Sequence, residues 1–221
     1  MWISNSPFAD IAIVWAKNEE GRIHGLIVER GMEGFTTPET HNKWSLRASS
    51  TGELIFDNVK VPKENRIGAD GFGFNFAMAV LNGGRIGIAS QALGIATGAY
   101  QLALDYSQQR KAFGKEIFKH QAIAFKLVDM ATSIMAAKML VFKAASEKDE
   151  GKDISQSGAM AKLYASQVAM DTTIEAVQIH GGNGYVAEYH VERMMRDAKI
   201  TQIYEGTSEI QRIVISRTLV S

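Results

Sequence analysis

The sequence predicts an α+β protein in which a small antiparallel β domain is followed by a C-terminal four-helix bundle. Apolar runs typical of strands occupy the chain as far as about Val61. All three prolines lie at or before Pro62, so long helices can form beyond it. From about Phe74 onward, apolar residues recur at helical spacing. We therefore expect a β-sheet domain at residues 1–68 and a helical domain at residues 69–221.

The β domain is expected to contain a hairpin and one further strand. Residues 11–17 and 22–29 are apolar runs joined by Asn18-Glu19-Glu20-Gly21, a turn with glycine at its end. Residues 53–61 alternate and stop at Pro62, which cannot donate to a strand ladder. The glycine-rich stretch from residue 62 to 73 is the predicted linker.

Three long helices and one short helix are predicted in the second domain. The long ones cover about residues 74–109, 120–148 and 154–179, and the short one follows Glu205. A turn or two of helix is expected around residues 191–198. Long helices with short connections form bundles, which gives the second half of the fold class.

Composition excludes several functions. The chain has 24 basic and 24 acidic residues, so it shows no charge bias toward nucleic acid or an anionic membrane. It has no cysteine, which excludes disulfides and thiolate catalysis and fits a reducing compartment. Its N-terminus lacks the features of a signal peptide, and no run of about 18 apolar residues is present. We expect a soluble, cytoplasmic protein without a membrane span.

The histidines do not predict a metal site. His24, His41, His120, His180 and His190 never fall in the HExxH or ExxH spacing that zinc and di-iron sites use. Hydrogen-bonded or solvated imidazoles are the expected alternative, and no metal is assigned.

Glu205 is the candidate catalytic residue. It stands between Tyr204 and Gly206, just before Thr207 and Ser208, either of which can cap the helix that follows. In one interpretation Glu205 is a first-turn acid that complements the helix dipole. In the other it is a general base, since a carboxylate among apolar side chains takes up a proton more readily. The local residues leave both open.

Two further clusters each allow a structural and a binding interpretation. The glycines of residues 180–185 follow a helix, so they are not a Rossmann fingerprint; they form a helix C-cap or let backbone N–H groups approach a phosphate or a ring. Arg110 and Lys111, ahead of Phe113, are a solvated helix end or, together with that turn, a diphosphate site.

Several ordered motifs across the whole chain resemble the acyl-CoA dehydrogenase family. They are Trp-Ile-Ser-Asn at 2–5, Arg-Lys-Ala-Phe-Gly-Lys at 110–115, Gln121 with residues 125–130, Gln-Ile-His-Gly-Gly-Asn-Gly-Tyr at 178–185, Arg-Asp-Ala-Lys-Ile at 196–200 and Ile-Tyr-Glu-Gly-Thr-Ser-Glu-Ile-Gln-Arg at 203–212. Residues 44–49 resemble the glutaryl-CoA dehydrogenase branch, whereas the chain from about Gly83 resembles short-chain, butyryl enzymes. The acyl chain length therefore stays open.

This resemblance implies an FAD-dependent enzyme that converts a short-chain acyl-CoA to the trans-2-enoyl-CoA. Glu205 would take the α-proton while the β-hydrogen leaves as hydride to N5 of FAD. Some branches place the base on an earlier helix, where this chain has Gly84. The family also has an N-terminal helical domain and first sheet strands that this sequence lacks, so we expect weaker FAD binding or slower turnover from the chain alone.

The resemblance also assigns site residues. The flavin contacts would be Trp2, Ile3, Ser4, Thr207, Ser208 and Glu209. The contacts to the FAD diphosphate and adenosine, commonly made to a neighbouring subunit's cofactor, would be Arg110, Phe113, Gln121, Gln178, Ile179, His180, Gly181 and Gly182. The substrate contacts would be Asn82, Gly83, Gly84, Arg85, Tyr204 and Gly206.

The expected partners are acyl-CoA, electron-transfer flavoprotein as electron acceptor, and further copies of the chain in a homotetramer. Two alternatives remain. The chain is an acyl-CoA oxidase or atypical dehydrogenase, distinguished by its electron acceptor, or it is a catalytically inactive helical bundle that only associates with partners.

Overall fold

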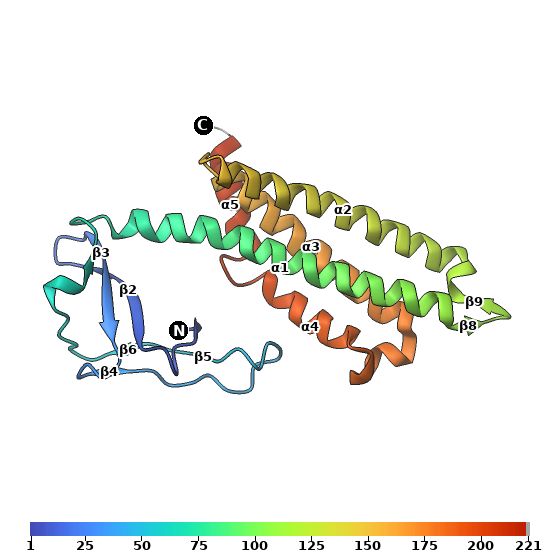
Figure 1. The fold of residues 1–221 in the computed structure, drawn as a ribbon, viewed down its shortest axis with the longest axis horizontal. Coiled ribbons are helices and arrows are strands. Elements are labelled where there is room, and N and C mark those ends of the chain that lie inside the picture. The colour runs from blue at the N-terminus through green and yellow to red at the C-terminus, as the bar shows by residue number, and fades with distance from the viewer. Residues whose placement is uncertain (220–221) are drawn as a thin grey trace. The chain divides into compact units, whose positions relative to one another are not determined.

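The computed structural model describes residues 1–219, which form two compact units (Figure 1). Antiparallel strands are the main secondary structure of the first unit and helices that of the second, so the predicted α+β fold class is confirmed. The units divide between Val80 and Leu81, inside helix α1 (Gly73–Gln109). The domain boundary expected at residue 68 stays a prediction.

The predicted hairpin is present in the first unit. Strands β2 (Ile11–Lys17) and β3 (Ile23–Glu29) pair antiparallel along their full length. The turn between them closes through the Asn18 amide, which donates to the Arg22 carbonyl at 2.9 Å, and through Gly21, whose φ is +78°. A positive φ suits glycine, which has no Cβ to clash.

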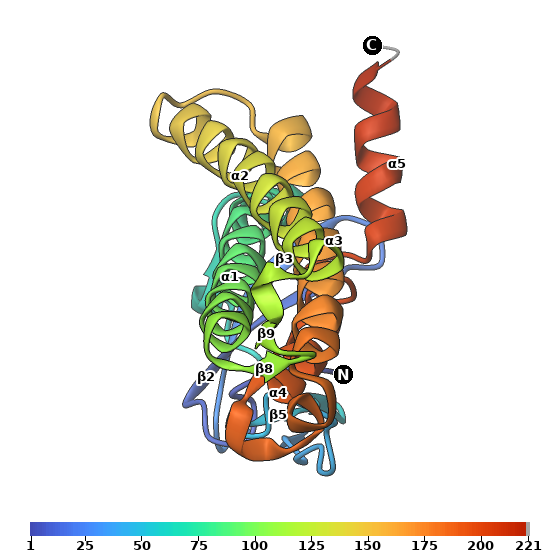
Figure 2. The ribbon, with the colours of Figure 1, turned by 90° about the vertical axis from the view of Figure 1, so that its right-hand side faces the viewer.

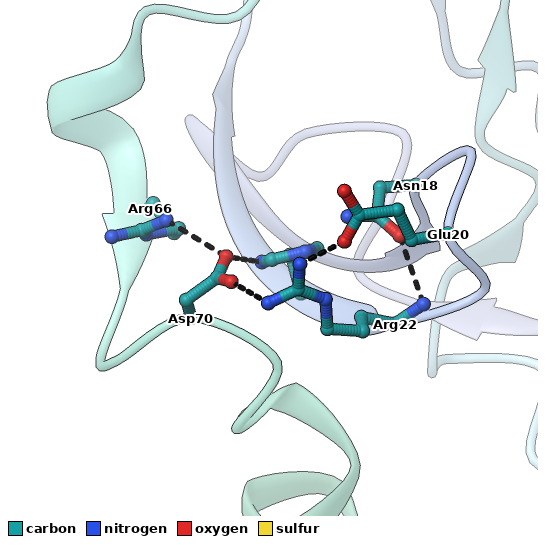
Figure 3. A network of polar contacts seen from close by, with 6 residues as sticks. Asn18, Glu20, Arg22, Arg66 and Asp70 are labelled. Atoms are coloured by element: carbon teal, nitrogen blue, oxygen red, sulfur yellow. Dashed lines mark hydrogen bonds and ion pairs between the residues drawn. The ribbon is translucent and has the colours of Figure 1, made fainter.

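The predicted linker at residues 62–73 is partly wrong, because it adds a strand to the hairpin. A short 3₁₀ helix, η1 (Lys63–Asn65), leads into β7 (Arg66–Ile67), which pairs with β3 and gives the sheet order β2-β3-β7. Asp70 accepts hydrogen bonds from Arg22 and, at 3.2 Å, from Arg66 (Figure 3). These contacts hold the stretch against the hairpin, so it is not a free connection.

The strand predicted at residues 53–61 is also wrong in its extent. Only β6 (Ile55–Phe56) forms, paired with β4 (Phe35–Thr36), and the Phe35 and Phe56 rings stack with centroids 5.1 Å apart. Asn58 follows with a φ of +52°, a left-handed conformation that ends the extended run. A second two-stranded pair joins β1 (Ile3–Ser4) and β5 (Thr51–Gly52).

The second unit contains the predicted helices at nearly the predicted bounds. Helices α2 (Gln121–Asp149) and α3 (Ser155–His180) follow α1, and α5 (Ser208–Leu219) follows Glu205. Between them α4 (Val191–Thr201) is a full helix of 11 residues, longer than the turn or two expected. The connections hold β8 (Lys111–Ala112), β9 (Lys115–Glu116), η2 (Ile117–Lys119), η3 (Gly181–Tyr185) and η4 (Ala187–Tyr189).

Small side chains build the core of the bundle, and α3 lies at its centre. Helix α3 packs against α2, α4 and α5, and Figure 2 shows α1, α2 and α3 running beside one another. Alanines with no exposed surface dominate the main core cluster: Ala89, Ala92, Ala96, Ala137, Ala144, Ala161, Ala165, Ala169 and Ala198. Small residues let helix backbones approach closely, which brings groups on α1 and α3 within reach of the turn before α5. No helix within residues 1–219 is long and apolar enough to cross a membrane.

Candidate active site

Glu205 lies in the turn that joins α4 to α5. Its φ is +56° and that of Gly206 is +87°, so two consecutive residues are left-handed. Such a conformation costs a non-glycine residue about 1–2 kcal/mol, so its surroundings must stabilise it. The turn closes where the Ser208 amide donates to the Gln202 carbonyl at 3.0 Å. Thr207 Oγ1 accepts from the Ile210 amide at 3.4 Å, so the predicted cap is confirmed at Thr207.

The Glu205 side chain lies directly against Gly84 of α1. A Cβ atom added to Gly84 would stand 2.6 Å from Cδ and 3.2 Å from Cγ of Glu205, and closer still to Oε1. Any side chain at position 84 would therefore displace the carboxylate. The predicted base and the α1 segment expected to contact the substrate therefore meet at this point.

Two buried side chains hold the backbone of the turn. Lys162 of α3 has no exposed surface, and its Nζ donates to the Gly206 carbonyl at 2.7 Å. Gln211 of α5 is equally buried, and its Nε2 donates to the Glu205 carbonyl at 3.1 Å and to the Gly206 carbonyl at 2.9 Å. Three side-chain hydrogen bonds thus fix two successive carbonyl groups beside the candidate base.

Tyr204 is held to α1 by its hydroxyl group. Tyr204 Oη donates to Gln91 Oε1 at 2.5 Å, and the ring is partly buried. Burial raises the pKa of the Tyr204 phenol, with the Gln91 hydrogen bond opposing that shift. The residue before Glu205 is therefore anchored to α1, and the residue after it to α3 and α5.

Arg85 is a buried cation with incomplete hydrogen bonding. Only 7% of its surface is exposed, and Nη1 donates to Asn82 Oδ1 at 2.7 Å. Asn82 in turn donates to Ser155 Oγ at 3.1 Å, which connects α1 to the start of α3. The Nε atom is buried and has no hydrogen-bond partner among residues 1–219. Burial lowers the pKa of Arg85, and the nearby charge of Glu205 opposes this.

The charge of Lys162 is also destabilised by its surroundings. Burial lowers the pKa of its ammonium group to about 8, while the carboxylates of Glu205 and Glu209 act to raise it and Arg85 acts to lower it. Two buried cations therefore face one carboxylate. Perturbed ionisable groups of this kind gather at functional sites more often than elsewhere.

A second group of expected site residues lies at the other end of the bundle. Tyr106 near the end of α1 stacks on His180 at the end of α3, with ring centroids 4.3 Å apart, and Asn183 donates to the Tyr106 hydroxyl at 3.0 Å. Gly181 caps α3 with a φ of +60°. Most members of the group are exposed, and Ile179 and His180 are buried; burial lowers the pKa of His180. The exposed members are Arg110, Phe113, Gln121, Gln178, Gly181 and Gly182.

The two groups are far apart in one copy of the chain. Gly84, which touches Glu205, and Gln109, which precedes Arg110, lie 25 residues apart on the continuous helix α1. At 1.5 Å per residue, this corresponds to about 38 Å. The structure brings together the expected base, the substrate residues and residues 207–209, and it separates them from the expected diphosphate contacts.

The remaining expected residues belong to the first unit. Ile3 and Ser4 form β1 and line a cavity of about 220 Å³ together with Ser6, Ile11 and Phe35. The Ser6 hydroxyl is buried without a hydrogen-bond partner in the described part of the chain. Trp2 precedes this strand with a φ of +62° and 67% of its surface exposed. The cavity thus has apolar walls and two hydroxyl groups.

Lys162 and Gln211 were not identified from the sequence. Lys162 falls among Gly158, Ala161 and Ala165, and a cation on that buried stripe of small residues is a recognisable signal. Gln211 has no comparable signal. The apolar residues Ile210 and Ile213 beside it predict that they, and not Gln211, form the buried face of α5. Both isoleucines are in fact more than 40% exposed, and Gln211 is what α5 buries.

Comparison with known proteins agrees with these observations. Residues 1–59 match the family described as acyl-CoA dehydrogenase, middle domain, and residues 71–220 match acyl-CoA dehydrogenase, C-terminal domain. Over 223 residues, the chain is 52% identical to the short-chain specific acyl-CoA dehydrogenase of Megasphaera elsdenii, covering 99% of this chain and 58% of that one.

Solved structures give the same result. Butyryl-CoA dehydrogenase from Megasphaera elsdenii superimposes with a TM-score of 0.96 at 51% identity, covering 100% of this chain and 59% of that one. A chain from a structure of the electron transferring flavoprotein of Acidaminococcus fermentans gives 0.95 at 50%, with coverage of 100% and 59%. A glutaryl-CoA dehydrogenase from Mycobacterium smegmatis in complex with FADH2 gives 0.94 at 33%, with coverage of 99% and 56%.

These relatives are longer than this chain. The chain spans about 58% of the length of the relatives it matches, and the match runs through nearly all of its own residues. Both family matches, the identity of about one half and the meeting of Glu205 with the α1 segment lead to one conclusion: the chain belongs to the acyl-CoA dehydrogenase family.

Proposed function

We propose that this chain is part of an FAD-dependent dehydrogenase that converts a short-chain acyl-CoA to the trans-2-enoyl-CoA, with Glu205 as the base that takes the α-proton. The observation that carries the proposal is the seating of the Glu205 carboxylate against Gly84, in a turn held by Lys162 and Gln211. A general base must be held in place to within hydrogen-bond reach of the proton that it removes.

The arrangement of charges supports this role for Glu205. Its side chain is partly buried, and the buried cations Arg85 and Lys162 interact with it electrostatically. A cation near the reacting atoms, here Arg85 with its unpartnered Nε, stabilises the negative charge that develops on the thioester as its α-proton leaves. Proton abstraction and charge stabilisation would then come from one compact set of residues.

The substrate would lie along the start of the bundle. We assign it contacts with Asn82, Gly83, Gly84 and Arg85 on α1 and with Tyr204 and Gly206 in the turn. The free Nε of Arg85 is a buried donor that an acyl-CoA oxygen could satisfy, and leaving such a donor unpaired is unfavourable. The glycine at 84 leaves room for the reacting carbon next to the carboxylate.

The residues present fit FAD, whose N5 atom would accept the β-hydrogen as a hydride. In the first unit, the cavity beside Ile3 and Ser4 joins apolar walls to the unpartnered Ser6 hydroxyl, a lining suited to a flat ring with polar edges. We assign Trp2, Ile3 and Ser4 to this part of the flavin site. In the second unit, Thr207, Ser208 and Glu209 open α5 next to Glu205, where the positive end of the helix dipole favours the oxygen atoms of a cofactor.

The diphosphate and adenosine contacts would serve the FAD of another copy. Arg110 follows the end of α1, about 38 Å along that helix from Gly84, the residue that Glu205 touches, and Gln121 and residues 178–182 belong to the same end of the bundle. This separation is longer than one FAD molecule. One copy therefore cannot use both groups on a single cofactor. We propose a homotetramer in which neighbouring copies complete each other's FAD sites.

An exposed apolar stripe on α2 supports this assembly. Its members recur at helical spacing and each is more than half exposed in one copy: Phe125, Val128, Met135, Met139 and Phe142. A monomer rarely leaves so many large apolar side chains on one helix face in water. A second copy of the chain would cover them.

Short-chain acyl groups are favoured over glutaryl groups as substrates. Identity to the butyryl-CoA enzyme is 51%, against 33% to the glutaryl-CoA enzyme, so the glutaryl-like segment at residues 44–49 does not determine the overall similarity. Electron-transfer flavoprotein is the proposed acceptor, supported by the match to the flavoprotein structure. The cytoplasmic location expected from the sequence belongs to the same proposal.

The experiment that tests this function records the visible flavin absorption of the purified protein under anaerobic conditions. We expect butyryl-CoA to bleach the flavin band of the wild-type protein and to leave that of Glu205→Gln unchanged. Glu147→Gln, an acid on α2 that pairs with Lys143, should behave as wild type. Bleaching in Glu205→Gln at the wild-type rate would overturn the assignment of the base.

A further inference from the structure

Lys162 is the largest side chain in the described chain that is completely buried. It extends from the first third of α3 among buried alanines, and an ammonium group there loses its hydration. Replacing a buried charge by a well-packed apolar side chain is often neutral or stabilising, so packing alone does not explain a lysine at this position. Its single hydrogen-bond acceptor in the described residues is the carbonyl oxygen of Gly206.

The hydrogen bonds around Gly206 use both lone pairs of that carbonyl oxygen. Lys162 Nζ donates from α3 at 2.7 Å, and Gln211 Nε2 donates from α5 at 2.9 Å. The same Gln211 nitrogen also donates to the Glu205 carbonyl at 3.1 Å. The backbone of the turn is therefore fixed from two helices, at the peptide that joins Glu205 to Gly206 and at the peptide that follows it.

This fixation bears on the orientation of the Glu205 side chain. A left-handed φ at a glutamate persists only when its surroundings determine it, and a freed turn would relax toward a right-handed conformation. Such a rotation would carry the carboxylate away from Gly84, against which it now lies. The direction of the base therefore depends on the backbone conformation of the turn, which the hydrogen bonds to the two carbonyl groups fix.

We propose that Lys162 is a positioning residue for Glu205: by holding the Gly206 carbonyl from α3, it keeps the carboxylate directed at the reacting carbon, and Gln211 assists it from α5. This inference rests on the proposed function of Glu205 and deepens it. Lys162 acts on the backbone of the turn, so it does not touch the substrate, and it transfers no proton in the reaction.

The charged groups that face Lys162 agree with this role. Glu205 in the turn and Glu209 on α5 favour its charged form, and Arg85 on α1 disfavours it. With a pKa of about 8, Lys162 is mostly charged at neutral pH and donates a charge-assisted hydrogen bond. Above that pH, a neutral amine remains, which is a weaker donor, so the turn should loosen as the pH rises through 8.

The test compares Lys162→Met, which keeps the chain length and removes the donor, with wild type and with Lys152→Met, an exposed lysine of the α2–α3 connection. We expect Lys162→Met to lower kcat about 100-fold, the size of effect that a displacement of about 1 Å produces, with KM for butyryl-CoA and flavin content nearly unchanged. The fall in wild-type kcat above pH 8 should be absent in this variant.

A second readout does not depend on turnover. Amide hydrogen exchange of the segment from residue 202 to 208 should become faster in Lys162→Met, whereas exchange in α2 stays as in wild type. If Lys162→Met does not fold, Gln211→Met tests the same turn from α5 and should show the same faster exchange with a smaller loss of kcat.

The outcomes separate this inference from the proposed function. Unchanged kcat and unchanged exchange in Lys162→Met, together with an inactive Glu205→Gln, would overturn the positioning role and leave the base in place. An active Glu205→Gln would overturn the function itself. A loss of flavin and helical content with no selective change at residues 202–208 would make Lys162 a structural residue and contradict the proposal.

Discussion

The carboxylate of Glu205 occupies the space where a side chain of residue 84 would stand. A Cβ on Gly84 would come within 2.6 Å of the Glu205 Cδ, although the two residues lie on α1 and in the α4–α5 turn, more than 100 positions apart. Glycine at 84 and glutamate at 205 are therefore coupled: the acid can adopt this position only because the helix offers no side chain there.

Gly84→Ala should inactivate the protein without unfolding it. The added methyl group would overlap the Glu205 carboxylate and displace it from its position beside α1. We expect kcat to fall about 100-fold while the flavin remains bound. Steady-state kinetics and the flavin spectrum measure the two quantities.

Gly87→Ala is the matched control on the same helix. Nothing lies within 4 Å of its added Cβ, and alanine is a better helix former, so the free energy of unfolding should rise by about 0.5–1 kcal/mol with kcat unchanged. Full activity in Gly84→Ala would show that Glu205 does not act from this position.

The stability of the protein should increase with pH between about 8 and 10. Folding lowers the pKa of Lys162 from 10.5 to about 8, so in this range the unfolded chain holds a proton that the folded chain has released. More protons bound to the unfolded state means that stability rises with pH, here by up to about 3 kcal/mol. Above pH 10, the raised pKa of Tyr204 acts in the opposite direction.

Urea unfolding across this pH range measures the effect. The difference between wild type and Lys162→Met isolates the lysine, since the other titrating groups are common to both proteins. If both proteins show the same pH dependence, Lys162 does not titrate in this range in the folded state.

The hydrogen bond between Tyr204 and Gln91 should contribute about 1 kcal/mol to stability. Tyr204→Phe removes the donor and leaves a partly buried amide oxygen without its partner. A double-mutant cycle with Gln91→Leu separates this coupling from the loss of either side chain alone. A coupling energy near zero would mean that the two residues do not interact in solution.

Substitution of the α2 stripe should dissociate the oligomer. Met135→Glu and Met139→Glu place acids where we expect another copy to pack, and sedimentation analysis should show smaller species with less bound flavin. Lys152→Glu, outside α2, should leave the assembly intact. An unchanged assembly in both methionine variants would place the interface elsewhere.

The sequence predicted the parts of this fold that depend on local pattern. The β2–β3 hairpin follows from two apolar runs around Gly21, and α1, α2 and α3 follow from apolar spacing in a proline-free region. The strand expected at residues 53–61 failed because its extent depends on a partner strand, β4, that is only two residues long. Pairing length is a property of the fold and not of one segment.

The site could be predicted only in part, because some of its contacts also depend on the fold and not on local sequence. Glu205, Gly84 and Arg85 belong to recognisable motifs, whereas the role of Lys162 depends on a contact with the carbonyl of a residue 44 positions away. Every residue has a backbone carbonyl, so the amino-acid types around Gly206 do not show that its carbonyl accepts a side-chain hydrogen bond. Gln211 was missed because exposed isoleucines flank it on α5.

The most direct test of the central claim follows the α-proton itself. A 3-thia-acyl-CoA carries sulfur at the β position, so it offers an α-proton and no β-hydride, and proton removal can be observed alone. In D₂O, the wild-type protein with bound FAD should exchange deuterium into the α-carbon, as detected by mass spectrometry, and Glu205→Gln with the same flavin content should not. Equal exchange in the two proteins would contradict the assignment of Glu205 as the base.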